Sequence, residues 1–343
     1  MILEDFNYDL PENLIAQKPL TLRDQSRLMV LNRSTEEIIH THFSRFPEYL
    51  SSGDLLILNN SRVIPARVWG RSRDREIEFL FLGETEPGVW KVLCRPAKHV
   101  REGEAVNFSP ALQGTVIEVL DEGQRKIRFH SEKVADVLET IGYAPLPPYI
   151  KRKENRDRMR SIDLERYQTV YAARDGSIAA PTAGLHFTQS LLDSILAHGI
   201  HVEYLTHDVG LATFQPVRVE DIEDHRILPE NFTITQKTAM AVNSAREDGR
   251  PVTAVGTTSV RALESSMRSD GIRAGTETTF LYIYPGYEFR SVDRLLTNFH
   301  LPKSTLLMLV SAFAGHNFIM NAYREAVRLG YRFYSYGDCM YII

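Results

Sequence analysis

The chain has 343 residues, 43% hydrophobic and 24% charged, which is the profile of an ordinary soluble globular protein. A net charge of −4 argues against a non-specific coat for nucleic acid, although local basic patches can still bind phosphate. Two cysteines far apart, Cys94 and Cys339, indicate reduced thiols rather than a disulfide framework or a metal site. No signal peptide or apolar run of membrane-spanning length is visible, so we expect a cytoplasmic protein.

The first predicted strand, at residues 54–58, ends in a polar run from Asn59 to Arg62. Ligands of open α/β sheets bind at the carboxyl ends of strands, so Asn59 and Asn60 are candidates for holding a sugar, a base or a carboxylate. The alternative is a simple turn in which these side chains bond to the backbone. The sequence favours neither interpretation.

Residues 62–148 have a different pattern, with short β-rich runs between turn residues. The runs lie at 63–69, 76–82, 89–94, 115–120 and 126–130. A short helix is predicted at 134–140, and a proline cluster ends the segment. Such spacing predicts a small antiparallel barrel or sandwich. We therefore predict an inserted β-barrel domain at 62–148, within a discontinuous α/β domain made of 1–61 and 149–343.

The rest of the chain alternates between strand and helix patterns, which predicts a mainly parallel α/β layer. The predicted strands are 178–180, 201–205 and 252–255, and the predicted helices are 188–199, 236–247, 259–267, 305–313 and 318–329.

A glycine turn at Val255 to Ser259 opens one of these helices. The first turn of a helix presents free N–H groups and the positive end of the helix dipole, which suit a carboxylate or a phosphate. Thr257 and Thr258 are therefore candidate binding residues, and the alternative is that they only cap the helix.

A second turn, from Pro181 to Thr188, contains small residues and a histidine. Thr182 and Gly184 would let a ligand approach the backbone closely. His186 supplies a group that titrates near neutral pH. A single loop histidine is more often structural than catalytic, so both interpretations stay open.

The third polar segment, Leu296 to Ser304, contains Asn298 and His300. On an extended segment these two side chains would face the same side. Near the C-terminus, Tyr334 to Asp338 resembles an aromatic-rich strand end whose rings could stack on a base, with core packing as the alternative.

The order of these motifs resembles the S-adenosylmethionine:tRNA ribosyltransferase-isomerase family over essentially the whole chain. The matching stretches lie within 8–17, 23–28, 53–67, 147–150, 163–171, 179–188, 255–261, 284–287, 297–307 and 335–338. Each stretch is short, and the resemblance is specific because so many of them occur in order.

This resemblance implies that the ribosyl part of S-adenosylmethionine, rather than its methyl group, is transferred to 7-aminomethyl-7-deazaguanine at the tRNA wobble position. Adenine and methionine leave, and epoxyqueuosine forms. The sulfonium acidifies the neighbouring ribose 5′ hydrogen, which a positioned base would remove. S-adenosylmethionine is then a ribosyl-donor substrate, tRNA is the partner, and no metal is needed. We also expect a monomer without membrane contact.

The resemblance and the polar motifs together give the predicted site residues. The predicted acid or base groups are His186 and His300. The residues predicted to bind or orient S-adenosylmethionine are Asn59, Asn60, Thr182, Gly184, Thr257, Thr258, Arg261, Asn298 and Asp338. The predicted tRNA contacts are Arg23, Arg62, Lys151, Arg152 and Lys153, for which a solvated surface is the alternative.

One stretch departs from the family pattern Thr-Leu-His-Val-Gly-x-Gly-Thr-Phe. Here Asp208 replaces the histidine and Ala212 a glycine, and further on Leu228 replaces a second histidine. The neighbouring His207 could compensate only if the strand shifted, because adjacent strand residues face opposite sides. Two other hypotheses are therefore kept. One is a family member that binds its substrates without ribosyl transfer. The other is a methyltransferase, against which the missing glycine-rich loop counts.

Overall fold

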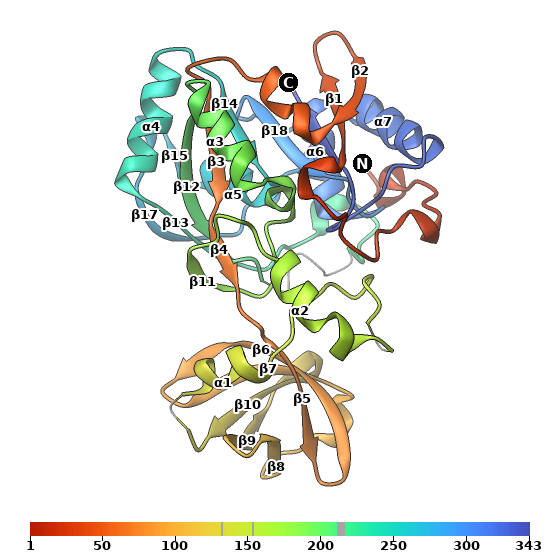
Figure 1. Cartoon of the computed structure of the whole chain (residues 1–343), viewed down its shortest axis with the longest axis vertical. Coiled ribbons are helices and arrows are strands. Elements are labelled where there is room, and N and C mark those ends of the chain that lie inside the picture. Colours follow the sequence, from red (N-terminus) through yellow and green to blue (C-terminus); the bar gives the residue numbers. More distant parts are fainter. Residues whose placement is uncertain (132, 153, 211–216) are drawn as a thin grey trace.

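The computed structural model describes residues 1–131, 133–152, 154–210 and 217–343. Figure 1 shows an α/β body that contains both chain ends and a separate β-barrel that the chain enters and leaves on the same side. The predicted class, α/β with an inserted β-barrel, is confirmed. The domain limits at 61/62 and 148/149 stay a prediction.

A nine-stranded sheet forms the α/β body within the described residues, in the order β17-β13-β12-β3-β14-β18-β19-β1-β2. In chain order its strands are β1 (Arg27–Asn32), β2 (Glu37–His42), β3 (Leu55–Asn59), β12 (His201–His207), β13 (Glu230–Ile234), β14 (Val252–Val255), β17 (Gly275–Thr279), β18 (Arg294–Asn298) and β19 (Cys339–Ile342). The four central strands β12, β3, β14 and β18 are parallel, and β1 is parallel to β19. The other pairings are antiparallel, so the expectation of a mainly parallel sheet is wrong.

Helices cover both faces of this sheet, which explains why its central strands are apolar throughout. Alternate residues of β3 separate the faces: Leu55 and Ile57 pack with α4 to α7, and Leu56 and Leu58 pack with α3. The helices are α3 (Gln189–Ala197), α4 (Gln236–Glu247), α5 (Thr257–Ser266), α6 (Thr305–Ala314) and α7 (His316–Arg328), close to the predicted ranges.

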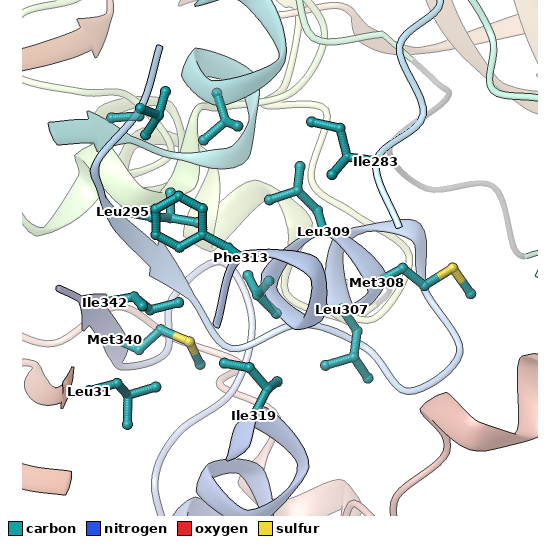
Figure 2. Packing of buried hydrophobic residues seen from close by; sticks show 14 of the residues in the cluster. Leu31, Ile283, Leu295, Leu307, Met308, Leu309, Phe313, Ile319, Met340 and Ile342 are labelled. Carbon is teal, nitrogen blue, oxygen red and sulfur yellow. The ribbon is translucent and has the colours of Figure 1, made fainter. Parts of the chain in front are cut away.

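The core beneath α6 joins strand and helix side chains into one buried cluster (Figure 2). Leu295 and Ile342 from the sheet share it with Leu307 and Phe313 from α6. Burying one such side chain stabilises a fold by about 2 kcal/mol. This packing fixes the position of the chain between β18 and α6, which carries Asn298 and His300.

The barrel is closed in the order β10-β7-β6-β5-β8-β9. Its strands are β5 (Arg67–Ser72), β6 (Arg75–Glu86), β7 (Val89–Arg95), β8 (Ala105–Ser109), β9 (Leu112–Val119) and β10 (Gln124–Phe129), followed by α1 (Val134–Ile141). The predicted run 63–69 is split into β4 (Ser61–Val63) and β5, because Pro65 in the middle has no N–H for a strand ladder. Strand β8 was not predicted.

Two other predictions are wrong. The strand expected at 178–180 lies earlier, as β11 (Arg174–Ser177), which pairs with β4 outside the main sheet. Tyr334 to Asp338 is not a strand end but a turn that precedes β19. Tyr334 has a φ of +70°, a conformation that a bulky residue adopts only where its surroundings hold it. The polar helix α2 (Arg156–Arg166) was also not predicted, because Asp163 is its only buried residue and it lacks an apolar face.

Candidate active site

A pocket lies at the carboxyl ends of β14 and β18, where neighbouring parallel strands of an α/β sheet bind ligands. Four of the segments predicted from sequence meet there, at residues 179–183, 256–258, 297–301 and 334–335. Of the predicted site residues, the lining contains Thr182, Thr257, Thr258, Asn298 and His300.

The N-terminus of α5 forms one wall of this pocket. Gly256 precedes it with a φ of +89°, and no side chain caps the first turn. The lining residues Thr257 and Thr258 therefore bring uncapped N–H groups and the positive end of the helix dipole to the pocket. Such a wall suits a group that carries or develops negative charge.

His300 follows β18 and lines the pocket. Its Nε2 lies 2.9 Å from the Thr297 hydroxyl, and its main chain is held by the hydroxyls of Tyr323 and Tyr8. Among the described residues Nδ1 has no hydrogen-bond partner, so it is available to a ligand. Burial lowers the pKa of His300 to about 3 and keeps the ring neutral at physiological pH.

His186 lies behind the pocket wall rather than in it. Its Nδ1 is 2.7 Å from Ser26 Oγ, and its Nε2 is 3.1 Å from the Asn298 side-chain nitrogen. The Asn298 amide donates to Nε2, so Nε2 carries no proton. Ser26 Oγ donates to the Arg23 carbonyl and is therefore free to accept from His186. We therefore assign the ring proton to Nδ1. Burial, with the charges of Arg332 and Arg23, lowers the pKa of His186 to about 3.

Asn298 connects His186 to the pocket. Its amide nitrogen also donates to the carbonyl of Tyr334 at 3.1 Å, which fixes the orientation of the side chain. Its Oδ1 is buried and has no partner among the described residues. A buried acceptor without a donor costs stability, about 1–3 kcal/mol, unless a ligand satisfies it. Asn298 therefore offers the pocket an oriented acceptor.

The two buried histidines predict a pH dependence of stability. Both pKa values fall from 6.5 in the unfolded chain to about 3 in the folded protein. The stability that they contribute is therefore complete above pH 6.5 and is lost as the pH falls towards 3. We expect a loss of about 1.4 kcal/mol per pH unit for each histidine, measured by urea unfolding between pH 6 and 4. A double His186→Gln, His300→Gln variant should flatten this slope, and an unchanged slope would contradict the assignment.

Three predicted residues brace the fold outside the pocket. Asn59 bonds to the backbone of His207 at both its oxygen and its nitrogen. Asn60 accepts a hydrogen bond from the Thr206 hydroxyl at 2.7 Å. Asp338 accepts from the main-chain nitrogens of Arg27 and Arg332. Asn59 Oδ1 also accepts from the Ser61 N–H at 3.1 Å, as the turn alternative expects, and binding by these residues stays a prediction.

Arg261 points from α5 into a buried charged cluster. Its Nη1 donates to Glu230 Oε2, which also lies 3.1 Å from His207 Nε2. His207 Nδ1 lies 3.0 Å from the carbonyl of Thr258, so the cluster supports the wall that α5 contributes to the pocket. We name His207, Glu230 and Arg261 the buried triad. Arg261 was predicted as a binding or orienting residue, but its pairing with His207 and Glu230 was missed, because the three residues are far apart in sequence.

Gly184 is required by packing. A Cβ at this position would lie 2.0 Å from the Tyr171 hydroxyl oxygen and 2.8 Å from Thr169 Cγ2. We expect Gly184→Ala to lower the free energy of unfolding by about 1–3 kcal/mol, measured by chemical denaturation. Adding Tyr171→Phe removes the nearest clash and should restore part of that loss. Equal stability of Gly184→Ala and the native protein would refute the packing role.

The predicted tRNA contacts are mostly engaged within the protein. Arg152 forms an ion pair with Asp163 at 2.7 Å, and Arg62 pairs with Glu139 and Asp175. Lys151 is exposed. Arg23 donates to the carbonyls of Leu185 and Glu165. Lys153 lies outside the described residues.

Three tyrosines line the pocket, Tyr149, Tyr167 and Tyr334, and the sequence prediction had given a possible stacking role only to Tyr334 among them. The Tyr149 and Tyr334 rings lie 4.6 Å apart between centroids, and the Tyr149 hydroxyl is 2.7 Å from Ser335 Oγ. These aromatic side chains could stack on a base. Two of them fall in stretches that match the family pattern, which was the available signal.

The stretch that departs from the family pattern lies beside the pocket. Val209 lines it, whereas Asp208 is directed towards Gly176, whose Cβ position would be 2.7 Å from Asp208 Oδ1. Burial raises the pKa of Asp208. Leu228 is exposed. Ala212 lies outside the described residues.

The described residues contain no group of three or more His, Cys, Asp or Glu side chains that could hold a metal ion. No single helix in the same part of the chain is long and apolar enough to cross a membrane.

Comparison with known proteins identifies the family. The family model described as "Queuosine biosynthesis protein" matches residues 3–342. The chain is 48% identical over 348 residues to a Staphylococcus epidermidis S-adenosylmethionine:tRNA ribosyltransferase-isomerase, covering 100% of both proteins. It is 50% identical over 349 residues to that of Symbiobacterium thermophilum, again covering 100% of both.

A solved structure is also similar, that of S-adenosylmethionine tRNA ribosyltransferase from Thermotoga maritima. It is 37% identical, the match covers 99% of this chain and 100% of the other, and the TM-score is 0.57. The chain therefore belongs to the S-adenosylmethionine:tRNA ribosyltransferase-isomerase family of queuosine biosynthesis, and the resemblance drawn from its motifs is confirmed.

Proposed function

We propose that this pocket is where the chain carries out the reaction of its family. The chain is an S-adenosylmethionine:tRNA ribosyltransferase-isomerase, which transfers and isomerises the ribosyl group onto 7-aminomethyl-7-deazaguanine in tRNA and yields epoxyqueuosine. The observation that carries the assignment to the pocket is the meeting of four family motifs at the carboxyl ends of β14 and β18.

In this proposal the residues around the pocket have separate roles. His300 is neutral, and its Nδ1 has no partner among the described residues, so this nitrogen removes the proton that the sulfonium acidifies. The N–H groups at the start of α5 stabilise the negative charge that develops as adenine leaves and the sugar rearranges. Asn298 Oδ1 accepts a hydrogen bond from the substrate. His186 is a positioning residue, because both its ring nitrogens are occupied.

The aromatic lining offers a surface for the base that reacts. Tyr149 and Tyr334 lie in the pocket, where a nucleobase taken out of its stack could rest against a ring. Wobble nucleotides lie in the anticodon loop, so little free energy is needed to unstack their bases and bring them into a pocket. We also propose that Thr182, Thr257 and Thr258 orient the S-adenosylmethionine.

The test is turnover of the full-length protein with S-adenosylmethionine and tRNA that carries the aminomethyl-deazaguanine. Release of one adenine per nucleotide that gains mass is the expected result. Binding of both substrates without adenine release would support the alternative of a family member that has lost catalysis. Methylated product with the adenosyl group retained would support the methyltransferase alternative.

A further inference from the structure

A second recess adjoins the active-site pocket and shares Ser335 with it. Arg23, Arg166 and His186 also line this recess, together with residues 19–20 and 336–337. His186 thus stands between the two hollows, bonded to Asn298 on the side of the pocket. We name this second hollow the arginine recess.

The guanidinium groups of Arg23 and Arg166 line the arginine recess. A third, that of Arg332, is held next to it, because Nη2 donates to the carbonyl of Lys18, which precedes the lining residue Pro19. Burial and the charge of Arg166 lower the pKa of Arg23, and the charge of Glu165 opposes this in part. Arginine side chains stay protonated in proteins, so the recess collects positive charge.

Two nitrogens of this cluster have no acceptor. Arg166 Nε and Arg332 Nη1 are buried without a hydrogen-bond partner among the described residues. The bonds that these side chains do make go to backbone carbonyls, such as that of Thr21, and not to carboxylates. Of the nearby acids, Asp338 is bonded to Arg27 and to the main chain of Arg332. Glu165 offers Arg23 its carbonyl.

We propose that the arginine recess binds an oxyanion, and that the occupant is a backbone phosphate of the tRNA next to the nucleotide in the pocket. This inference rests on the proposed function. Planar guanidinium groups match the geometry of phosphate oxygens and bind them through paired hydrogen bonds. The carboxylate of S-adenosylmethionine carries the same single charge, but the recess lies beyond His186 from the pocket that we propose for that ligand.

The test compares Arg166→Gln, Arg332→Gln and the double variant with Arg324→Gln, an exposed arginine on α7 that serves as the control. The dissociation constant for tRNA is measured at several salt concentrations, and the KM for S-adenosylmethionine at saturating tRNA. The double variant should bind tRNA about tenfold or more weakly, since hydrogen bonds to charged groups are lost. The slope of log affinity against log salt should fall by about 0.7 for one phosphate contact.

A second double variant distinguishes the loss of a phosphate contact from a folding defect. Arg166→Lys with Arg332→Lys keeps the charge but loses the paired geometry, so tRNA affinity should fall while the salt slope stays near that of the native protein. Native affinity and slope in the double Gln variant would overturn the proposal. A raised KM for S-adenosylmethionine with unchanged tRNA affinity would also overturn it, because the recess would then bind S-adenosylmethionine. If the native protein itself fails to bind tRNA, the proposed function fails, not the recess alone.

Discussion

Replacing His300 with Asn should lower kcat by about 10²–10⁴-fold, the usual contribution of a positioned acid or base. His300 is the predicted acid or base group that lines the pocket, and in the part of the chain that the structure describes its Nδ1 has no partner. Asparagine is smaller but polar, so the surrounding hydroxyls keep a partner. Adenine release under single-turnover conditions gives the rate of the chemical step.

The matched control for this variant is His42→Asn, which changes an exposed histidine at the end of β2. It should turn over at the native rate. The pH profile gives a second check, because burial holds the pKa of His300 at about 3. Protonation of His300 should therefore limit the rate only in strong acid. A His300→Asn enzyme with native kcat would remove this residue from the chemistry.

Replacing Glu230 with Gln should destabilise the protein by about 3–5 kcal/mol, because the positive charge of Arg261 would stay buried without its carboxylate. Side-chain exposure is 1% for Glu230 and 6% for Arg261, so water cannot substitute for the lost partner. Urea unfolding at pH 7 measures the loss. Glu48→Gln, which breaks an exposed pair with Arg45, should cause no comparable loss.

The contribution of Glu230 to the free energy of unfolding depends on pH. Burial opposes its ionisation, but the hydrogen bond from His207 and the charge of Arg261 together lower the pKa to about 2. A lowered carboxyl pKa stabilises the fold above the ordinary value of 4.5, and the effect is lost as the pH falls towards 2. Stability of the Glu230→Gln variant equal to that of the native protein at pH 7 would contradict the role of the buried triad.

Much of the fold follows from local patterns in the sequence. The helices from α3 to α7 and the central strands β3 and β14 were predicted near their observed limits, because periodicity and glycine turns mark them. The mixed pairing of the sheet was not, since strand direction depends on contacts between distant segments. Strands β1 and β17 were not predicted, and β11 pairs away from the sheet.

The candidate site was predicted only in part for a similar physical reason. Asn298 and His300 both line the pocket, but so does Phe299 between them, so the predicted alternation stays a prediction. The separation of His186 from the pocket could not be predicted, because it depends on Ser26 and Asn298, which are distant in sequence. The packing requirement at Gly184 depends in the same way on Tyr171.

Diffraction from crystals soaked with S-adenosylmethionine would test the central claim most directly. We expect density for the ligand between the start of α5 and the loop after β18, with Asn298 Oδ1 and His300 Nδ1 within hydrogen-bond distance of it. Density at another place on the chain, with this pocket empty at saturating ligand, would contradict the assignment.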